Sequence, residues 1–452
     1  MFFMTENQKP RQFLEGPPSP RLWWLKVKEI FHERVVGQHV GANKPKTENR
    51  KPFLSILHNH KISNAMKKFF NNLNVSLSLL AGILLIFSCT SSPSEDKSTK
   101  TGHEGDITLV DPDATSETKA LFHNLLKYQD SAIMFGHQDD LAYGIGWWGD
   151  DFRSDVHDVC QKFPAVFGWD AGEIGKVRNI DSVRFIRMQN WMIHVFERGG
   201  INTLSWHLDN PVTGGDTWDT SPAVHDIIPG GEKHDLYKSL LDSLAKYIQE
   251  LKTENGTAVP VIFRPFHELN GSWFWWGEKN CSREDYIALF RFTVEYLRDE
   301  KEVHNLLYSY SPDRFNSEEE YLDRFPGKEY VDVLGYDDYH SFASERSISK
   351  GIESLRTLVE LGEKMNKPAA LTETGLEKIP IPNWWTDYIF NPIKTDSIAR
   401  KISYFLVWRN ADTTHHYAPY PGHPSAENFI HFEQDEYSWF LEDLPDMYTL
   451  KD

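Results

Sequence analysis

The segment Val259–Glu268 (VPVIFRPFHE) joins a short apolar run to three chemically active side chains. Val259–Phe263 is rich in β-branched and aromatic residues, which is typical of a buried strand. Arg264, His267 and Glu268 follow this run directly. In parallel α/β folds the binding and catalytic groups lie at the C-terminal ends of the strands. The segment therefore predicts a parallel α/β fold whose functional site lies just beyond this strand.

Similar apolar runs recur along the chain from about residue 105. The eight predicted strands are Ala132–Phe135, Ala165–Trp169, Asn202–Trp206, Val259–Phe263, Asn305–Tyr310, Val331–Gly335, Pro368–Leu371 and Ser403–Val407. Helical periodicity separates them, clearest over Ser182–Arg198, Asp235–Lys252, Arg283–Glu300 and Ile352–Met365, and an extra helix is expected at Ser116–Tyr128. This alternation predicts an α/β protein with a single (β/α)8 TIM barrel over residues 113–452. An open doubly wound sheet is the alternative, although no Gly-x-Gly-x-x-Gly motif follows the first run.

Polar residues follow nearly every run and would meet at one mouth of such a barrel. These strand-end residues are His137–Asp140, Asp170, His207–Asn210, Arg264, His267–Asn270, Asp337, Tyr339, Thr372–Thr374 and Trp408–Asn410. A single Glu at a strand end is commonly a surface or capping residue. The convergence of so many acidic, basic and aromatic side chains is what predicts an active site.

Glu268 and Glu373 are the candidate catalytic pair, because they follow the fourth and seventh runs and would face each other across the mouth. Two carboxyl groups about 5–5.5 Å apart suit a retaining glycoside hydrolase, in which one is an acid and the other a nucleophile. Their environments must then separate their pKa values. Arg409 and His267 are expected to provide this tuning, with a cation near Glu373. A purely structural ion-pair network is the alternative.

Composition restricts the partners. The 48 basic and 66 acidic residues give a net charge of −18, which argues against nucleic acid and against charge-driven binding to an anionic membrane. Aromatic residues make up 13% of the chain and include 15 Trp, which suits either sugar stacking or a large core. The three cysteines form no disulfide framework, and no zinc-binding motif occurs, so we expect no metal and no cofactor.

The beginning of the chain differs from the rest. Residues 1–65 hold 11 basic and 5 acidic side chains, a net of +6, and are expected to be an upstream extension without a role in the fold. Residues 66–88 match a signal peptide, with Met66-Lys67-Lys68 before the apolar run Val75–Phe87. Cys89 follows, as in a loose bacterial lipobox, and residues 89–112 are expected to be a polar tether. These features predict export and a lipid anchor at Cys89 in the bacterial outer membrane, on its periplasmic or cell-surface face.

The strand-end motifs resemble those of glycoside hydrolase family 26, whose characterised members are mostly β-mannanases. The matching segments are Phe135–Gln138, Ser205–His207, Arg264–Gly271 with Trp273 and Trp275-Trp276, Gly335–Tyr339, Leu371–Gly375 and Val407–Asn410. The resemblance covers about residues 115–445. It implies a (β/α)8 barrel and a double-displacement mechanism with retention.

The resemblance also implies roles for individual residues. Glu268 corresponds to the acid/base and Glu373 to the nucleophile, and His267 fills the position directly before the acid/base. The implied substrate-binding residues are His207, Trp218, His267, Trp273, Asp337, Tyr339, Trp408 and Arg409, with Trp218 and Trp408 as aromatic platforms. The loops 144–149 and 383–392 match no family motif, and we expect them to shape distal subsites.

The predicted function is that of a monomeric, exported endo-1,4-β-mannosidase acting on mannan, glucomannan or galactomannan. A mannobiose-releasing exo-enzyme and a β-xylan or mixed-linkage glucan hydrolase of the same family are alternatives. A non-catalytic glycan-binding lipoprotein is another, although a binding protein would not need both carboxylates, and both are present in full motifs.

Overall fold

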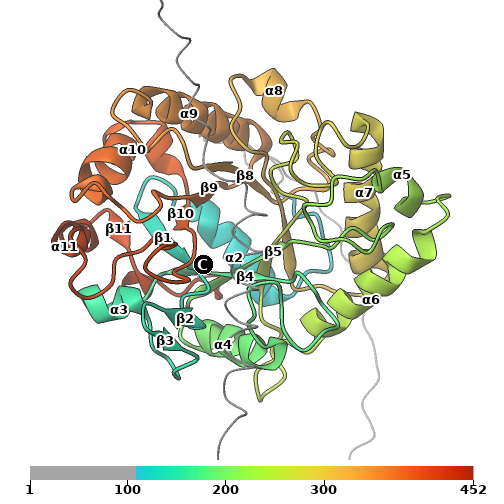
Figure 1. Cartoon of the computed structure of the whole chain (residues 1–452), viewed down its shortest axis with the longest axis horizontal. Helices are drawn as coiled ribbons and strands as arrows, with labels where there is room; N and C mark the ends of the chain where they lie inside the picture. The colour runs from blue at the N-terminus through green and yellow to red at the C-terminus, as the bar shows by residue number, and fades with distance from the viewer. Residues whose placement is uncertain (1–107, 451–452) are drawn as a thin grey trace, which may run out of the picture. The chain divides into compact units, whose positions relative to one another are not determined.

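The computed structural model describes residues 108–450, and their main feature is a closed barrel of eight parallel strands (Figure 1). The closure comes from the last barrel strand pairing with the first, Met134 beside Tyr404. In spatial order the strands are β1 (Ile133–Gln138), β4 (Val166–Asp170), β5 (Ile201–Trp206), β6 (Val261–Pro265), β7 (Leu306–Tyr310), β8 (Val333–Asp338), β9 (Ala369–Thr374) and β10 (Tyr404–Val407). The predicted (β/α)8 barrel is confirmed, and the closure excludes the open sheet.

Helices surround the barrel in Figure 1. They are α3 (Asp155–Cys160), α4 (Phe185–Glu197), α5 (Val224–Ile227), α6 (His234–Gln249), α7 (Arg283–Glu295), α8 (Glu318–Leu322), α9 (Ile348–Met365), α10 (Asn391–Thr395) and α11 (Ala426–Glu433). Short π or 3-10 turns lie at Tyr296–Glu300, Trp385–Phe390, Ala399–Lys401 and Leu441–Asp443. Two further short strands, β2 (Tyr143–Gly144) and β3 (Trp147–Trp148), form a hairpin after β1, and β11 (Ser438–Trp439) pairs with β1. None of the helices in the described part of the chain is both long and apolar enough to cross a membrane.

Alternate strand residues divide the core into two layers. Side chains such as Phe167, Leu204 and Phe263 pack outward against the surrounding helices. Val166 and Ile262 belong to a second cluster inside the barrel. The period of two in a strand produces this division.

Helix α2 (Ser116–Lys127) closes the end of the barrel where the strands begin. Its Leu121, Phe122 and Leu125 join the inner cluster. Thr115 caps the helix by accepting a hydrogen bond from Thr118 N at 3.2 Å. The polar strand ends are therefore left to form the opposite, open mouth.

Both ends of the described chain lie at this closed end. Val110 N donates to Asp332 Oδ1 at 2.8 Å, directly before β8, and Lys367 Nζ donates to Thr108 O at 2.9 Å, before β9. Asn124 of α2 donates to Met447 O at 3.1 Å. The packed fold thus begins at or before Val110, whereas the tether was expected to continue to residue 112. The predicted extension 1–65, the signal peptide 66–88 and Cys89 lie outside the described residues.

The expected helices differ from the observed ones only at their ends. Helix α4 begins at Phe185 rather than Ser182, because Ser182 has a φ of 66° and the Asn179 side chain accepts from Val183 N at 2.8 Å. Helix α9 begins at Ile348, four residues before the expected start at Ile352. It ends at Met365, and the next residue, Asn366, has the left-handed conformation. Such a residue is a common helix terminator.

Candidate active site

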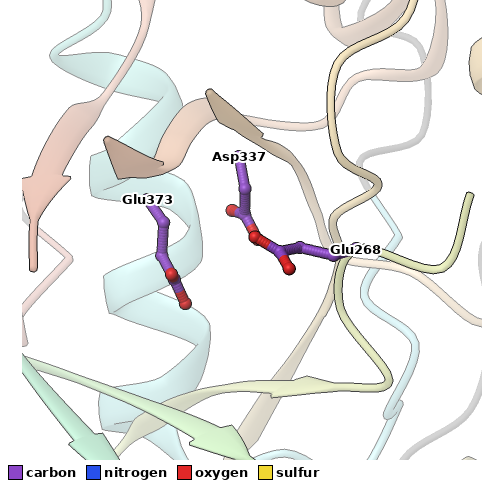
Figure 2. Close-up of side chains that lie close together, drawn as sticks. All are labelled: Glu268, Asp337 and Glu373. Carbon is purple, nitrogen blue, oxygen red and sulfur yellow. The ribbon is translucent and has the colours of Figure 1, made fainter. Parts of the chain in front are cut away.

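Three carboxyl groups meet at the mouth of the barrel. Glu268 lies in the loop after β6, Asp337 in β8 and Glu373 in β9, and Figure 2 shows their side chains close together, with Glu268 extending toward Asp337. One oxygen from each lies within 4.8 Å of the others. The predicted pair Glu268 and Glu373 is therefore close enough for retention rather than inversion, which needs about 6.5–9.5 Å for an intervening water.

The backbone around Glu268 is held in an uncommon conformation. Phe266 and Glu268 have φ values of 52° and 53°, in the left-handed region. Glu268 N donates to Ser311 O at 2.8 Å, and Trp276 Nε1 donates to His267 O at 2.8 Å. Non-glycine residues with such φ values are uncommon and cluster at functional sites. These contacts stabilise the turn that aims Glu268 at the mouth.

The surroundings of Glu268 favour its neutral form. Loss of hydration around the partly buried carboxyl raises its pKa well above the ordinary value, and the nearby charges of Asp337 and Glu373 raise it further. Trp273 Nε1 donates to Glu268 Oε2 at 2.5 Å and opposes this shift, because a donor stabilises the carboxylate. Glu268 is thus suited to hold a proton and act as a general acid.

Glu373 has the opposite environment, because it accepts hydrogen bonds from a cation and a phenol. Arg264 donates to Glu373 Oε1, and Tyr339 OH donates to Oε2 at 2.8 Å. The cation beside Glu373 is therefore Arg264, and the expectation that Arg409 would occupy this place is wrong. Arg264 reaches Glu373 because it is an inward-facing residue of β6, whereas Arg409 pairs with Asp181 at 2.9 Å on the β1 side of the mouth.

Arg264 also fixes Asp337. Its Nη1 donates to Asp337 Oδ2 at 2.8 Å and to Ser311 Oγ at 3.0 Å, and Thr372 Oγ1 donates to Asp337 Oδ1 at 2.7 Å. Burial raises the pKa of Asp337, although Arg264 opposes the rise. Among the described residues, these three carboxyls form the group whose geometry could hold a metal ion. Their oxygens instead accept from a guanidinium, hydroxyls and an indole, which fits acid–base chemistry better than metal ligation.

Two histidines form a relay beside the carboxyl groups. Burial lowers the pKa of His207, but the Asp170 charge and the 2.6 Å hydrogen bond from His207 Nδ1 to Asp170 Oδ2 outweigh it, so the pKa is raised. Burial, Arg264 and His207 together lower the pKa of His267 well below its usual range. The Nε2 atoms of His207 and His267 lie 3.2 Å apart, within hydrogen-bond distance. The lowered pKa disfavours a charged His267, so its expected tuning of the carboxyl groups would not come from a positive charge.

Aromatic rings line the mouth around His207. Trp408 and Trp218 each have ring centroids 6.0 Å from it, and Phe274 lies at 5.5 Å. Trp273, beside Glu268, is 39% exposed. The predicted platforms Trp218 and Trp408 are therefore both at the site, with one more ring, Phe274, that the sequence analysis did not identify.

A cavity of about 490 Å3 is lined by residues that follow β6 and β7. Trp273, Asn270, Asp313 and Arg314 are among its lining residues. Asn270 Nδ2 donates to Asp313 O at 3.1 Å, which joins the loops after β6 and β7. The cavity therefore adjoins the loop that carries Glu268, through Leu269 and Trp273.

The structure brings together most of the predicted site residues. His207, Trp218, His267, Glu268, Trp273, Asp337, Tyr339, Glu373 and Trp408 are all linked by contacts at the mouth, while Arg409 lies farther toward β1. His267 is only 1% exposed, so its direct contact with substrate stays a prediction. The sequence analysis assigned no role to Arg264 or Asp170, although both were visible as polar strand-end residues.

The loop 383–392 contributes to the core. Trp384 Nε1 donates to Phe342 O at 2.7 Å, and Trp384 and Trp385 are completely buried. Four more tryptophans, Trp169, Trp206, Trp275 and Trp276, are also fully buried. Much of the tryptophan surplus therefore belongs to the core, and the expectation that 383–392 shapes a distal subsite has no support from its two tryptophans.

Comparisons with known proteins agree with this geometry. The sequence model of glycosyl hydrolase family 26 matches residues 110–418. A family 26 β-mannanase structure from Bacteroides ovatus has 45% identity and a TM-score of 0.72, covering 75% of this chain and 98% of that one. A modular endo-β-1,4-mannanase from Cellulomonas fimi has 34% identity and a TM-score of 0.71, covering 76% and 79%. A mannan endo-1,4-β-mannosidase from Bifidobacterium adolescentis is 38% identical over 315 residues, 66% of this chain but only 31% of that relative.

Proposed function

Because the chain belongs to glycosyl hydrolase family 26, we propose that it is an endo-1,4-β-mannosidase that cleaves β-mannan with retention of configuration. The observation that carries this proposal is the pair Glu268 and Glu373, whose carboxyl oxygens lie within 4.8 Å. Their separation suits a covalent glycosyl-enzyme intermediate. A glycan-binding protein without activity would need neither the spacing nor the separate environments of the two groups.

The first step transfers the sugar to the enzyme. Glu373 attacks the anomeric carbon while Glu268 gives its proton to the glycosidic oxygen, so the bond to the leaving group breaks as the bond to Glu373 forms. Arg264 and Tyr339 orient the attacking carboxylate through their hydrogen bonds. The cavity that adjoins the Glu268 loop takes the leaving part of the chain.

The second step releases the sugar. Glu268, now a carboxylate, removes a proton from a water molecule, and this water attacks the anomeric carbon on the face vacated by the leaving group. Glu373 leaves as a carboxylate stabilised by Arg264. Two inversions at the same carbon return the β configuration.

Mannan is the proposed substrate because the family 26 structures from Bacteroides ovatus and Cellulomonas fimi are mannanases by name. His207, Asp337 and Arg409 supply donors and acceptors for hydroxyl groups, and Trp218, Trp273 and Trp408 supply flat apolar surfaces. We propose that linear mannan, glucomannan and galactomannan all bind at this mouth. The enzyme acts as a monomer and cleaves bonds within the polymer chain.

One experiment tests activity, specificity and stereochemistry together. Proton NMR of mannohexaose during hydrolysis should show the β-anomer first and several early product lengths, as internal attack requires. Xylohexaose and mixed-linkage gluco-oligosaccharides should remain intact. An initial α-anomer would contradict retention, early release of mannobiose alone would indicate exo action, and faster cleavage of a xylan or glucan oligomer would contradict the substrate.

We further propose that the protein is exported and anchored to the outer membrane through a lipid on Cys89. The support is in the sequence, where a basic segment and a 13-residue apolar run precede Cys89. Two acyl chains on one cysteine provide stable anchoring, whereas one chain is marginal.

A further inference from the structure

The hairpin β2–β3 presents one tryptophan outward and buries its neighbour. Its strands pair Tyr143 with Trp148 and Gly144 with Trp147. Trp147 is 7% exposed and its Nε1 donates to Asp155 Oδ1 at 2.7 Å, while Trp148 is 52% exposed. Successive strand residues point to opposite faces, which explains the contrast. The indole of Trp148 is therefore about half exposed to solvent although it lies in a β-strand, which is unusual for a large apolar side chain.

The exposed indole is held in a fixed orientation. Its ring stacks on Tyr143 with centroids 4.6 Å apart and planes 15° apart. Tyr143 is buried, and its OH donates to Asp139 Oδ2 at 2.6 Å. Tyr143 therefore covers one face of the indole.

The rest of the hairpin is also braced. Ile145 N donates to Asp155 Oδ2 at 2.8 Å, and Arg187 Nη2 donates to Gly149 O at 2.6 Å. Arg153 lies over the Trp147 ring at 5.3 Å. These contacts fix the hairpin at both ends, so little conformational entropy remains to be lost when a ligand binds Trp148.

A continuous set of contacts connects Trp148 to the active site. Arg409 Nη1 donates to the Tyr143 OH at 3.2 Å, on the side of the mouth formed after β1 and β10. The neighbouring Trp408 contacts His207, which touches His267 beside the acid Glu268. The cavity proposed for the leaving group is lined by residues that follow β6 and β7, the strands across the barrel from β10 and β1. Trp148 is thus on the side of the mouth that keeps the glycosyl part of the substrate.

We propose that the free face of Trp148 binds a pyranose unit of the mannan chain at a distal subsite on the glycone side. The C–H face of a pyranose is apolar and flat enough to stack on an indole. The occupant follows from continuity with the site: the polymer that lies across Glu373 must continue past Arg409 and Tyr143. This inference rests on the proposed function and names a subsite for it.

The test compares Trp148→Ala with wild type over manno-oligosaccharides of three to six sugars. On chains long enough to reach Trp148 the variant should lose about 10-fold in kcat/KM, and on the shortest cleaved chain it should match wild type. Trp148→Tyr, which keeps a ring, should recover part of the loss. Phe152→Ala is the matched control, because Phe152 is 46% exposed on the same loop but packs on His194 with centroids 4.1 Å apart.

Two results would overturn the proposal: equal kcat/KM for Trp148→Ala and wild type at every length, or the same loss at every length. A binding measurement separates this inference from the proposed function. Calorimetric titration of mannohexaose into Glu373→Gln and into Glu373→Gln/Trp148→Ala should show about 10-fold weaker binding to the double variant. If that difference appears while wild type hydrolyses no mannan, only the proposed function fails; if both variants bind equally, the subsite does not exist.

Discussion

Arg264 gives the two proposed catalytic carboxyl groups, Glu268 and Glu373, different surroundings. It is buried and donates to both Glu373 and Asp337. With Glu268 close to both, one cation lies beside a group of three acidic side chains. Glu268 is the acid that receives no hydrogen bond from it. Burial and the charges of Asp337 and Glu373 raise the pKa of Glu268, which favours its protonated form. The proposed nucleophile, Glu373, is thus the carboxyl group that accepts a hydrogen bond from Arg264, and the proposed acid, Glu268, is the one that does not.

Glutamine at each position should therefore affect different substrates. Glu373→Gln should abolish turnover of every substrate, since no covalent intermediate can form. Glu268→Gln should lower kcat/KM on mannan by about 100-fold to 10,000-fold, the usual contribution of a general acid. An aryl mannobioside with an acidic phenol needs no protonation, so its kcat/KM for Glu268→Gln should stay near wild type.

The comparison uses kcat/KM because this constant covers only the steps up to departure of the leaving group. Thermal unfolding of both variants controls for folding, and the isosteric amide keeps the volume of the site. Equal losses on mannan and on the aryl substrate would show that Glu268 is not the acid.

The indole of Trp273 gives a second prediction, concerning pH. Glu268 acts in its protonated form, so kcat/KM falls as the pH rises through its raised pKa. Trp273 donates to Glu268 Oε2 at 2.5 Å and stabilises the carboxylate, which lowers that pKa. Trp273→Phe removes the donor, so the pKa should rise and the alkaline limb of the kcat/KM profile should move to higher pH.

The position of this limb, and not the height of the profile, is the measurement, because loss of the exposed indole also weakens sugar binding. A profile whose alkaline limb stays in place, or moves to lower pH, would contradict the role given to Trp273. The Trp148→Ala protein is a suitable reference, since it loses an indole that does not touch Glu268.

The sequence could identify the catalytic pair but not the residue that tunes it. Glu268 and Glu373 follow apolar runs four and seven, and barrel closure alone makes them face each other. Arg264 and Arg409 are both strand-end cations, and their order in the chain does not reveal which one reaches Glu373. That depends on the inward orientation of Arg264 within β6, a matter of side-chain direction across the barrel.

At the scale of elements, apolar runs located all eight barrel strands but cut several of them short. β1, β4, β8 and β9 continue into Gln138, Asp170, Asp338 and Thr374. Backbone pairing in a parallel barrel does not require an apolar side chain, so the ladder extends into the residues that form the site. The sequence analysis therefore placed these polar residues after the strands, whereas in the structure they are the last residues of the strands.

The hairpin β2–β3 was not predicted, since each strand has only two residues. Alternation needs about four residues to be recognised in a sequence. The segment around Trp384 and Trp385 shows a different limit, because it was expected to shape a distal subsite only on the ground that it matches no family motif. Burial against Phe342 and Ser425 depends on packing between distant segments, which local sequence does not reveal.

For the whole molecule, the proposed anchor and the barrel should be separable. A protein that begins at Thr90 should remain active and stay in the soluble fraction, because no catalytic or barrel residue identified above precedes Val110. In the native bacterium, Cys89→Ala should move activity out of the membrane fraction. Activity measured in both fractions, against a Cys160→Ala control, checks this.

Two outcomes would contradict the separation of anchor and barrel. An inactive or aggregated protein beginning at Thr90 would mean that earlier residues are needed for folding. A Cys89→Ala protein that remains with the membrane would mean that the apolar run is retained or that attachment is elsewhere.

The closed end of the barrel also fixes a direction. Thr108 and Val110 bond to Lys367 and Asp332, which lie shortly before β9 and β8, so the chain enters the fold at the face opposite Glu268 and Glu373. The proposed lipid anchor would therefore be joined to the barrel at the face opposite the mouth, so attachment to a bilayer does not require the mouth to face the lipid. An insoluble polysaccharide too large to diffuse could then be bound and cleaved at the mouth without approaching the lipid.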